Sequence, residues 1–135
     1  MIEALRFEVG NQAFAKLLRQ WMKRKRMTIE ELSARTGISI DTVKEMRSPR
    51  MRDKQKVFRL KNVIAIAIGL HLPFKDSIHL LRNAGYRLRK YDVIDKIYLK
   101  ILSQYYDYPV ASCNDYLVAL GLLPLTNNDN ISSYL

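Results

Sequence analysis

The stretch that decides the fold runs from residue 28 to residue 47 and reads TIEELSARTGISIDTVKEMR. Thr28 is followed by a glutamate three residues later, which is the spacing of a capping box at the start of a helix. Gly37 supplies the left-handed conformation that ends a helix. Ser39 is suited to cap a second helix over residues 40–46. Two short helices joined by a glycine turn cross steeply, so this stretch predicts a helix-turn-helix.

The small and apolar residues of the stretch meet the packing requirements of that motif. Ser33 places a small side chain where the two helices must approach each other closely. The residues expected to point inward are Leu32, Thr36, Ile38, Val43 and Met46. Because one stretch satisfies all of these constraints together, the prediction is far more specific than a lone glycine would allow.

Apolar residues at spacings of three and four predict further helices on both sides of this motif. We expect them over residues 13–26, 60–70, 73–84 and 91–106, and a last helix follows the break at Pro109 and runs to about residue 120. The helix over residues 60–70 is nearly apolar throughout, so it is expected at the centre of the core. Only 5 glycines and 4 prolines occur among 135 residues. The expected fold class is therefore all-α.

The positive charge of the chain is large and is concentrated in its first half. The formal net charge is +10. Residues 1–61 carry 16 lysines and arginines against 7 aspartates and glutamates, whereas residues 106–135 carry no basic residue and 3 aspartates. A surplus of this size and location favours binding to a nucleic acid over a role in solubility alone.

The sequence offers no set of residues for catalysis or for metal binding. His71 and His79 lie on different expected helices, and the single cysteine, Cys113, is expected to be a buried structural thiol. Metal-ligand spacings and glycine-rich phosphate loops are absent. We therefore expect no enzyme activity, no cofactor and no metal. The longest apolar run, residues 63–72, is too short to span a bilayer and no signal peptide is visible, so a cytoplasmic protein is expected.

Several segments of residues 14–84 follow the pattern of a known family: the apolar stripe of the first helix, Met27-Thr28, Glu30-Glu31-Leu32, Thr36-Gly37-Ile38-Ser39, Thr42-Val43 and the sequence IAIAIGL over residues 64–70. On these residues the chain resembles the XRE family of regulators, which includes the lambda repressor and Cro. The resemblance implies a five-helix domain that binds double-stranded DNA with its third helix in the major groove, commonly as a homodimer. The expected function is a transcription regulator that acts as a repressor. Many members have Gln where this chain has Ile29, so backbone amides are expected to replace that phosphate contact.

In this docking geometry the outward residues near the start of the third helix contact base edges. Those residues are Ile40, Asp41, Thr42, Lys44 and Glu45. Lys44 is suited to guanine O6 or N7, the acids to cytosine N4, and Ile40 to a thymine methyl. The residues expected at the DNA backbone are Thr28, Ser39, Arg47, Arg50, Arg52 and Lys54. The alternative is that the acids and Lys44 form a solvated surface with no role in base recognition.

The chain is expected to divide into three parts. Residues 1–85 form the helix-turn-helix domain, residues 86–125 a short helical extension, and residues 126–135 a flexible tail. The extension carries Tyr91, Tyr98 and Tyr105 at spacings of seven, expected on one helix face in the core or in a dimer interface. We expect the extension to mediate dimerisation or to bind a protein partner. Two alternatives remain open, namely an antitoxin-type protein and an interaction module that kept the fold without binding an operator.

Overall fold

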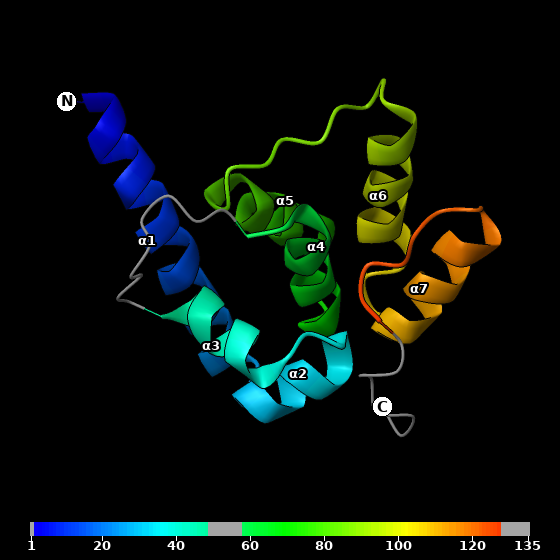
Figure 1. Ribbon diagram of the computed structural model, residues 1–135, viewed down its shortest axis with the longest axis horizontal. Coiled ribbons are helices and arrows are strands. Elements are labelled where there is room, and N and C mark those ends of the chain that lie inside the picture. The colour runs from blue at the N-terminus through cyan, green and yellow to red at the C-terminus, as the bar shows by residue number, and fades with distance from the viewer. Residues whose placement is uncertain (1, 49–57, 128–135) are drawn as a thin grey trace.

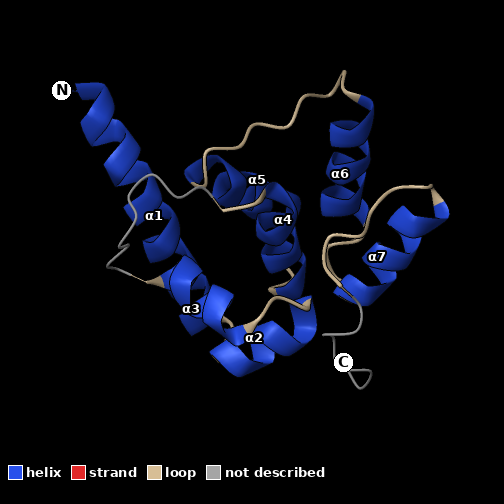
Figure 2. Ribbon diagram, viewed as in Figure 1, coloured by secondary structure: helices blue, strands red, loops and turns tan. Residues whose placement is uncertain are grey.

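The computed structural model describes residues 2–48 and 58–127, with side chains from residue 12 onward. Every regular element in these ranges is an α-helix, and none of them is a strand, as Figure 2 shows. The helices are α1 (Ile2–Arg24), α2 (Ile29–Thr36), α3 (Ile40–Arg47), α4 (Leu60–Gly69), α5 (Phe74–Asn83), α6 (Val93–Gln104) and α7 (Val110–Ala119) (Figure 1). The described part of the chain is therefore all-helical, as predicted.

The first helix is much longer than the sequence pattern predicted. α1 begins at Ile2, whereas the predicted start was residue 13, just before the apolar stripe becomes regular at Phe14. The residues before that stripe include good helix formers and no proline, so nothing in the sequence ends the helix there. The other helix ends lie within two residues of the predicted ones, which is the usual uncertainty at helix termini.

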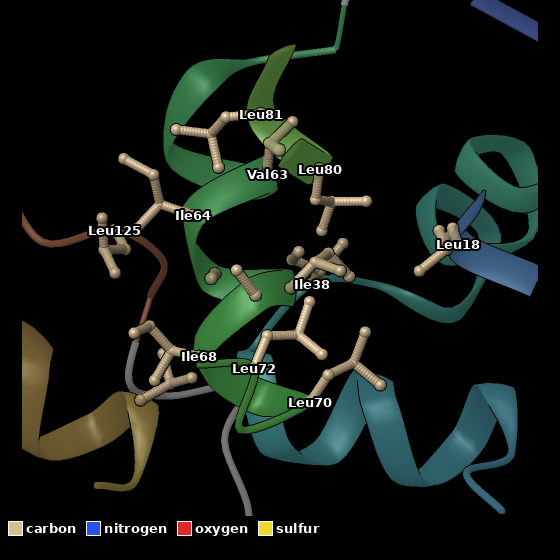
Figure 3. Close-up of a cluster of buried hydrophobic side chains, with 14 of the residues drawn as sticks. Leu18, Ile38, Val63, Ile64, Ile68, Leu70, Leu72, Leu80, Leu81 and Leu125 are labelled. Carbon is tan, nitrogen blue, oxygen red and sulfur yellow. The ribbon is translucent and has the colours of Figure 1, made fainter. Parts of the chain in front are cut away.

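Helix α4 forms the centre of the core, as predicted. All of its residues from Val63 to Gly69 are buried. α2, α5, α6 and α7 pack against α4, whereas α1 packs against α3 and α5. Figure 3 shows the apolar side chains of α4 directed outward on several sides, toward Leu80 and Leu81 of α5 and toward Leu125 near the C-terminus. The helix-turn-helix is thus one face of a larger core built around α4.

Gly69 lets α2 approach α4 closely. A Cβ atom at Gly69 would lie 2.7 Å from Cγ2 of Thr36 and 3.3 Å from Cδ1 of Leu32. Both of these side chains are fully buried on the inner face of α2, as predicted. The Nη1 group of Arg35 also donates a hydrogen bond to the carbonyl of Gly69 at 3.4 Å. α2 therefore sits on the central helix through a contact that a side chain at Gly69 would obstruct.

Helices α6 and α7 share one hydrophobic core with the helix-turn-helix. The left-handed Gly85, with φ of +91°, marks the turn that leaves α5. Beyond it α6 packs on α4 and α5, and α7 packs on α2 and α4. The buried residues that they add to the cluster are Tyr98, Ile101, Leu102, Val110, Cys113 and Leu117. Residues 86–125 are therefore packed onto the preceding helices.

The predicted alignment of three tyrosines on one helix face is wrong. α6 begins two residues later than predicted because Asp92 is its N-cap, and the Asp92 side chain accepts a hydrogen bond from the N–H of Asp95 at 2.9 Å. Tyr91 consequently precedes the helix and is 89% exposed. Tyr98 is buried, and Tyr105 is the half-buried C-cap. Only the middle tyrosine belongs to the buried face of α6.

Candidate nucleic-acid interface

Helix α2 is bounded by the two caps that the sequence predicted. Thr28 is the N-cap, and its Oγ1 accepts a hydrogen bond from the N–H of Glu31 at 3.1 Å. Gly37 is the C-cap with φ of +82°, and its N–H donates to the carbonyl of Ser33 at 2.9 Å. A side chain at this left-handed position would be strained. The caps therefore fix both ends of an eight-residue helix.

The turn between α2 and α3 is held by two side-chain hydroxyls. The Oγ of Ser33 donates to the carbonyl of Ile38 at 2.6 Å. The Oγ1 of the fully buried Thr36 donates to the carbonyl of Leu32 at 2.7 Å and accepts from the N–H of Ile38 at 3.2 Å. Both polar groups of Ile38 are thus paired with α2. These bonds fix the angle at which the chain enters α3.

Helix α3 has one buried side and one open side. Ser39 is its N-cap, and the Oγ atom accepts from the N–H of Thr42 at 3.2 Å and donates to the hydroxyl of Thr42 at 2.9 Å. Val43 and Met46 are fully buried on the inner side, as predicted. The outward residues are Ile40, which is 40% exposed, the exposed Asp41 and Lys44, and the half-buried Thr42 and Glu45. The structure therefore brings the five predicted base-contacting residues onto one accessible helix.

Residues 17–67 match a family model described as the Cro/C1-type HTH DNA-binding domain. The match spans α2, α3 and nearly all of α4, together with the second part of α1. Residues 17–67 are therefore similar to this domain family, and α2, the turn at Gly37 and α3 have the geometry of a helix-turn-helix. No curated protein and no solved structure gave a match.

Ile29 stands where many members of the XRE family have Gln, and here it is an apolar packing residue. It is the first residue of α2, it is only 9% exposed, and it belongs to the hydrophobic core. Its side chain is therefore a packing residue. At this helix end the N–H of Glu31 is bonded to the Oγ1 of Thr28, and the amides of Ile29 and Glu30 have no partner within the helix.

The C-terminal end of α3 is tied to α1. The Nη1 group of Arg19 donates a hydrogen bond to the carbonyl of Arg47 at 2.7 Å, and both residues are half-buried. Arg47 was predicted at the DNA backbone. Arg50, Arg52 and Lys54, which were predicted there too, lie outside the described residues. Arg19 was not among the predicted site residues, because nothing in the spacing of α1 distinguishes it from the neighbouring basic residues.

A hollow of about 480 Å³ lies beside the N-terminal end of α3. Residues from the turn before α3, from α3, from the start of α4 and from the C-terminal segment line it: Gly37, Ile38, Ser39, Thr42, Arg59, Lys61, Asn62, Leu123, Pro124, Leu125, Thr126 and Asn127. Its two cations are the exposed Arg59 and the half-buried Lys61. Arg59 belongs to the basic run that follows α3 in the sequence. This run was a signal from which Arg59 could have been predicted as a site residue.

A second hollow, of about 470 Å³, lies at the opposite end of α3. Its lining comes from the end of α1, the start of α2 and Arg47. The charged residues in it are the cations Arg19, Lys23, Arg26 and Arg47 and the acid Glu30. Cations therefore flank both ends of the helix whose outer side carries the predicted base-contacting residues.

The described residues offer little other chemistry. They contain no group of three or more His, Cys, Asp or Glu side chains that could hold a metal ion. No described helix is long and apolar enough to cross a membrane. Cys113 is buried, and burial raises the pKa of its thiol to about 11. A thiol with so high a pKa is a poor nucleophile at neutral pH, which agrees with the structural role that was predicted for it.

Proposed function

We propose that this protein is a sequence-specific DNA-binding transcription regulator that acts as a repressor. The observation that carries the proposal is the outer side of α3, where Ile40, Asp41 and Lys44 are exposed between two hollows lined with cations. An α-helix fits the major groove of B-DNA, and cations near both of its ends can neutralise phosphates of the backbones that border the groove.

The exposed side chains of α3 are assigned to base contacts by their chemistry. Lys44 donates to guanine O6 or N7, and Ile40 packs against a thymine methyl. Asp41 or Glu45 accepts from cytosine N4, while Thr42 contacts the edge of the site. The hydrogen bond between Ser39 and Thr42 holds the two hydroxyls at the beginning of the helix.

The DNA backbone is assigned to the groups around α3. Thr28 and Ser39 cap the N-termini of α2 and α3, where free amides and the helix dipole favour a phosphate. Arg47 lies in the second hollow, and Arg59 adds a cation to the first. The basic residues between α3 and α4, Arg50, Arg52 and Lys54, complete the proposed backbone contacts.

Selection from a pool of randomised duplexes tests this function. A sequence-specific DNA-binding protein enriches a defined motif, and its affinity for that motif exceeds its affinity for random duplex by about a thousandfold or more. Arg59→Ala should weaken binding to all duplexes alike and lower the slope of log K against log salt by about one. An unenriched pool bound only weakly and with strong salt dependence would reject the function.

A homodimer is the proposed binding form, on a near-palindromic site. Its support is the resemblance to the XRE family and the apolar surface before and at the start of α6, where Tyr91, Val93 and Ile94 are 89%, 75% and 45% exposed. Light scattering of the full chain tests it. Val93→Asp should convert the dimer to a monomer, because a buried unpaired carboxylate is costly at an interface. A monomeric wild type would reject this part of the proposal.

The same apolar surface also favours a second function, in which the chain binds another protein through residues 86–125. A regulator of the antitoxin type would use both the DNA-binding helix and this surface. A small protein that co-purifies with the wild type and is lost with Val93→Asp supports this function. A pure wild-type chain that still selects a DNA motif supports the regulator alone.

A further inference from the structure

The chain returns to the helix-turn-helix after α7. Gly121, with φ of +79°, reverses the chain, and the N–H of Leu122 donates to the carbonyl of Leu117 at 2.9 Å. Figure 1 shows the segment after α7 passing back toward α2. Leu125 is only 4% exposed and lies beside Ile64 of α4 in Figure 3. Residues 122–127, which we name the C-terminal strap, are thus anchored in the core.

The strap is held by the side chain of Asn114 in α7. Asn114 is fully buried. Its Oδ1 accepts from the N–H of Leu125 at 2.9 Å, and its Nδ2 donates to the carbonyl of Thr126 at 3.1 Å and to the Oγ1 of Thr126 at 3.3 Å. A buried amide is costly unless it is hydrogen-bonded. These three bonds satisfy both ends of the Asn114 side chain and fix the position of Thr126.

Thr126 in turn binds the end of α2. Its Oγ1 donates a hydrogen bond to the carbonyl of Thr36. Thr36 is the last residue of α2, so its carbonyl has no partner within that helix. The Oγ1 of the same Thr36 accepts from the N–H of Ile38 in the turn. A continuous chain of hydrogen bonds therefore runs from Asn114 through Thr126 to the residue that shapes the turn before α3.

We propose that Asn114 and Thr126 are positioning residues for DNA recognition. They hold the end of α2, and with it the turn that sets the direction of α3. We call the hydrogen bonds that link Asn114, Thr126 and Thr36 the brace. Thr126 also lines the hollow that Ser39 and Thr42 line at the N-terminal end of α3, so the brace lies beside this helix. Base readout depends on side chains held to within about 0.5 Å by the surrounding structure. This inference rests on the proposed DNA-binding function.

The test compares Thr126→Val, which has the same shape without the hydroxyl, with Thr126→Ser, which keeps the hydroxyl. Ser103→Ala is the matched control, because Ser103 is exposed and donates to Lys100 within its own helix. Amide hydrogen exchange at Gly37 and Ile38 is measured without DNA. Affinity is measured for the selected motif and for random duplex, and thermal melting checks that each variant is folded.

If the brace holds the turn, the amides of Gly37 and Ile38 should exchange about tenfold faster in Thr126→Val than in the wild type. It also predicts about tenfold weaker binding to the motif with unchanged binding to random duplex. Thr126→Ser and Ser103→Ala should behave like the wild type. Unchanged amide exchange and unchanged affinity in Thr126→Val would overturn the inference. Tighter binding of DNA by Thr126→Val would also overturn it, because the strap would then obstruct the DNA.

The two proposals fail in distinguishable ways. If the wild type selects no motif, the DNA-binding function fails, while faster exchange in Thr126→Val still supports the brace on the turn. If the wild type selects a motif that Thr126→Val binds equally well, the function stands and the positioning role of Thr126 is rejected.

Discussion

The guanidinium of Arg19 on α1 lies 2.7 Å from the backbone carbonyl of Arg47 and donates a hydrogen bond to it. Arg47 is the last residue of α3, so this carbonyl has no partner within the helix. At the other end of α3, the Oγ of Ser39 caps the N–H of Thr42. The proposed recognition helix is therefore held at both of its ends by side chains before any DNA is bound.

Replacing Arg19 with alanine should lower the stability of the fold. The variant loses a charge-assisted hydrogen bond at a half-buried site, and we expect the free energy of unfolding to fall by about 1 kcal/mol. Lys16→Ala is the matched control, because Lys16 is an exposed cation on the same helix and its loss changes the net charge equally. Urea denaturation measures both variants. Equal stability of the two would contradict a structural role for Arg19.

Replacing Gly69 with alanine should destabilise the protein, although alanine is the better helix former. The new Cβ would lie 2.7 Å from Cγ2 of Thr36, which is buried and whose hydroxyl is fixed by bonds to Leu32 and Ile38. Overpacking costs about 1–3 kcal/mol, and the gain in helix propensity is up to about 1 kcal/mol. We expect a net loss of about 1–2 kcal/mol in the free energy of unfolding.

The cause of that loss can be isolated in a double-mutant cycle. Thr36→Ser removes the Cγ2 atom and keeps the hydroxyl, so it makes room for the new Cβ. Gly69→Ala should then cost little in the Thr36→Ser background. The same loss in both backgrounds would show that contact with Thr36 is not what makes glycine necessary.

The buried thiol of Cys113 should make the protein less stable at high pH. Burial raises the pKa of the thiol from 9.0 to about 11 in the native state. Between these values the unfolded chain loses the proton and the native chain keeps it, so stability falls as the pH rises. At pH 10.5 this effect amounts to roughly 2 kcal/mol relative to pH 8.

Cys113→Ala isolates the thiol from the other groups that titrate in this range. Burial also raises the pKa of Tyr86, and burial and the charge of Asp95 raise that of Tyr98, but both tyrosines remain in the variant. Urea denaturation at pH 8 and pH 10.5 should show a smaller loss of stability in Cys113→Ala than in the wild type. Equal losses would mean that the thiol does not titrate differently in the two states.

The sequence predicted the features that depend on local patterns. Thr28, Gly37 and Ser39 take their predicted positions because caps are set by the chemistry of a few adjacent residues. The central position of α4 followed from its apolar composition. The start of α1 was missed because the helix continues beyond the regular part of its apolar stripe, and Tyr91 was misplaced because Asp92 starts α6 later.

The contacts that hold the candidate site in place had no signal in the sequence. Thr126 and Thr36 are 90 residues apart, and Arg19 and Arg47 are 28 residues apart. No periodicity or spacing links such pairs, because only the packing of the whole chain brings them together. The strap crosses the boundary between the predicted extension and the predicted flexible tail, but Thr126, the first residue of that tail, is held by hydrogen bonds to Asn114 and Thr36. Residues 128–135 of the predicted tail lie outside the described residues.

The proposal that the exposed side of α3 recognises bases is tested most directly by measuring the affinities of a Lys44 variant for a set of duplexes. The wild type and Lys44→Ala are titrated with the selected duplex and with every single-base-pair variant of it. Lys96→Ala, an exposed lysine lost from α6, controls for the change in charge. We predict that Lys44→Ala costs about 1–3 kcal/mol on the selected duplex and no longer discriminates at one base pair, while Lys96→Ala keeps the wild-type preferences. A loss that is the same for every duplex, as a general charge effect would give, would contradict the claim.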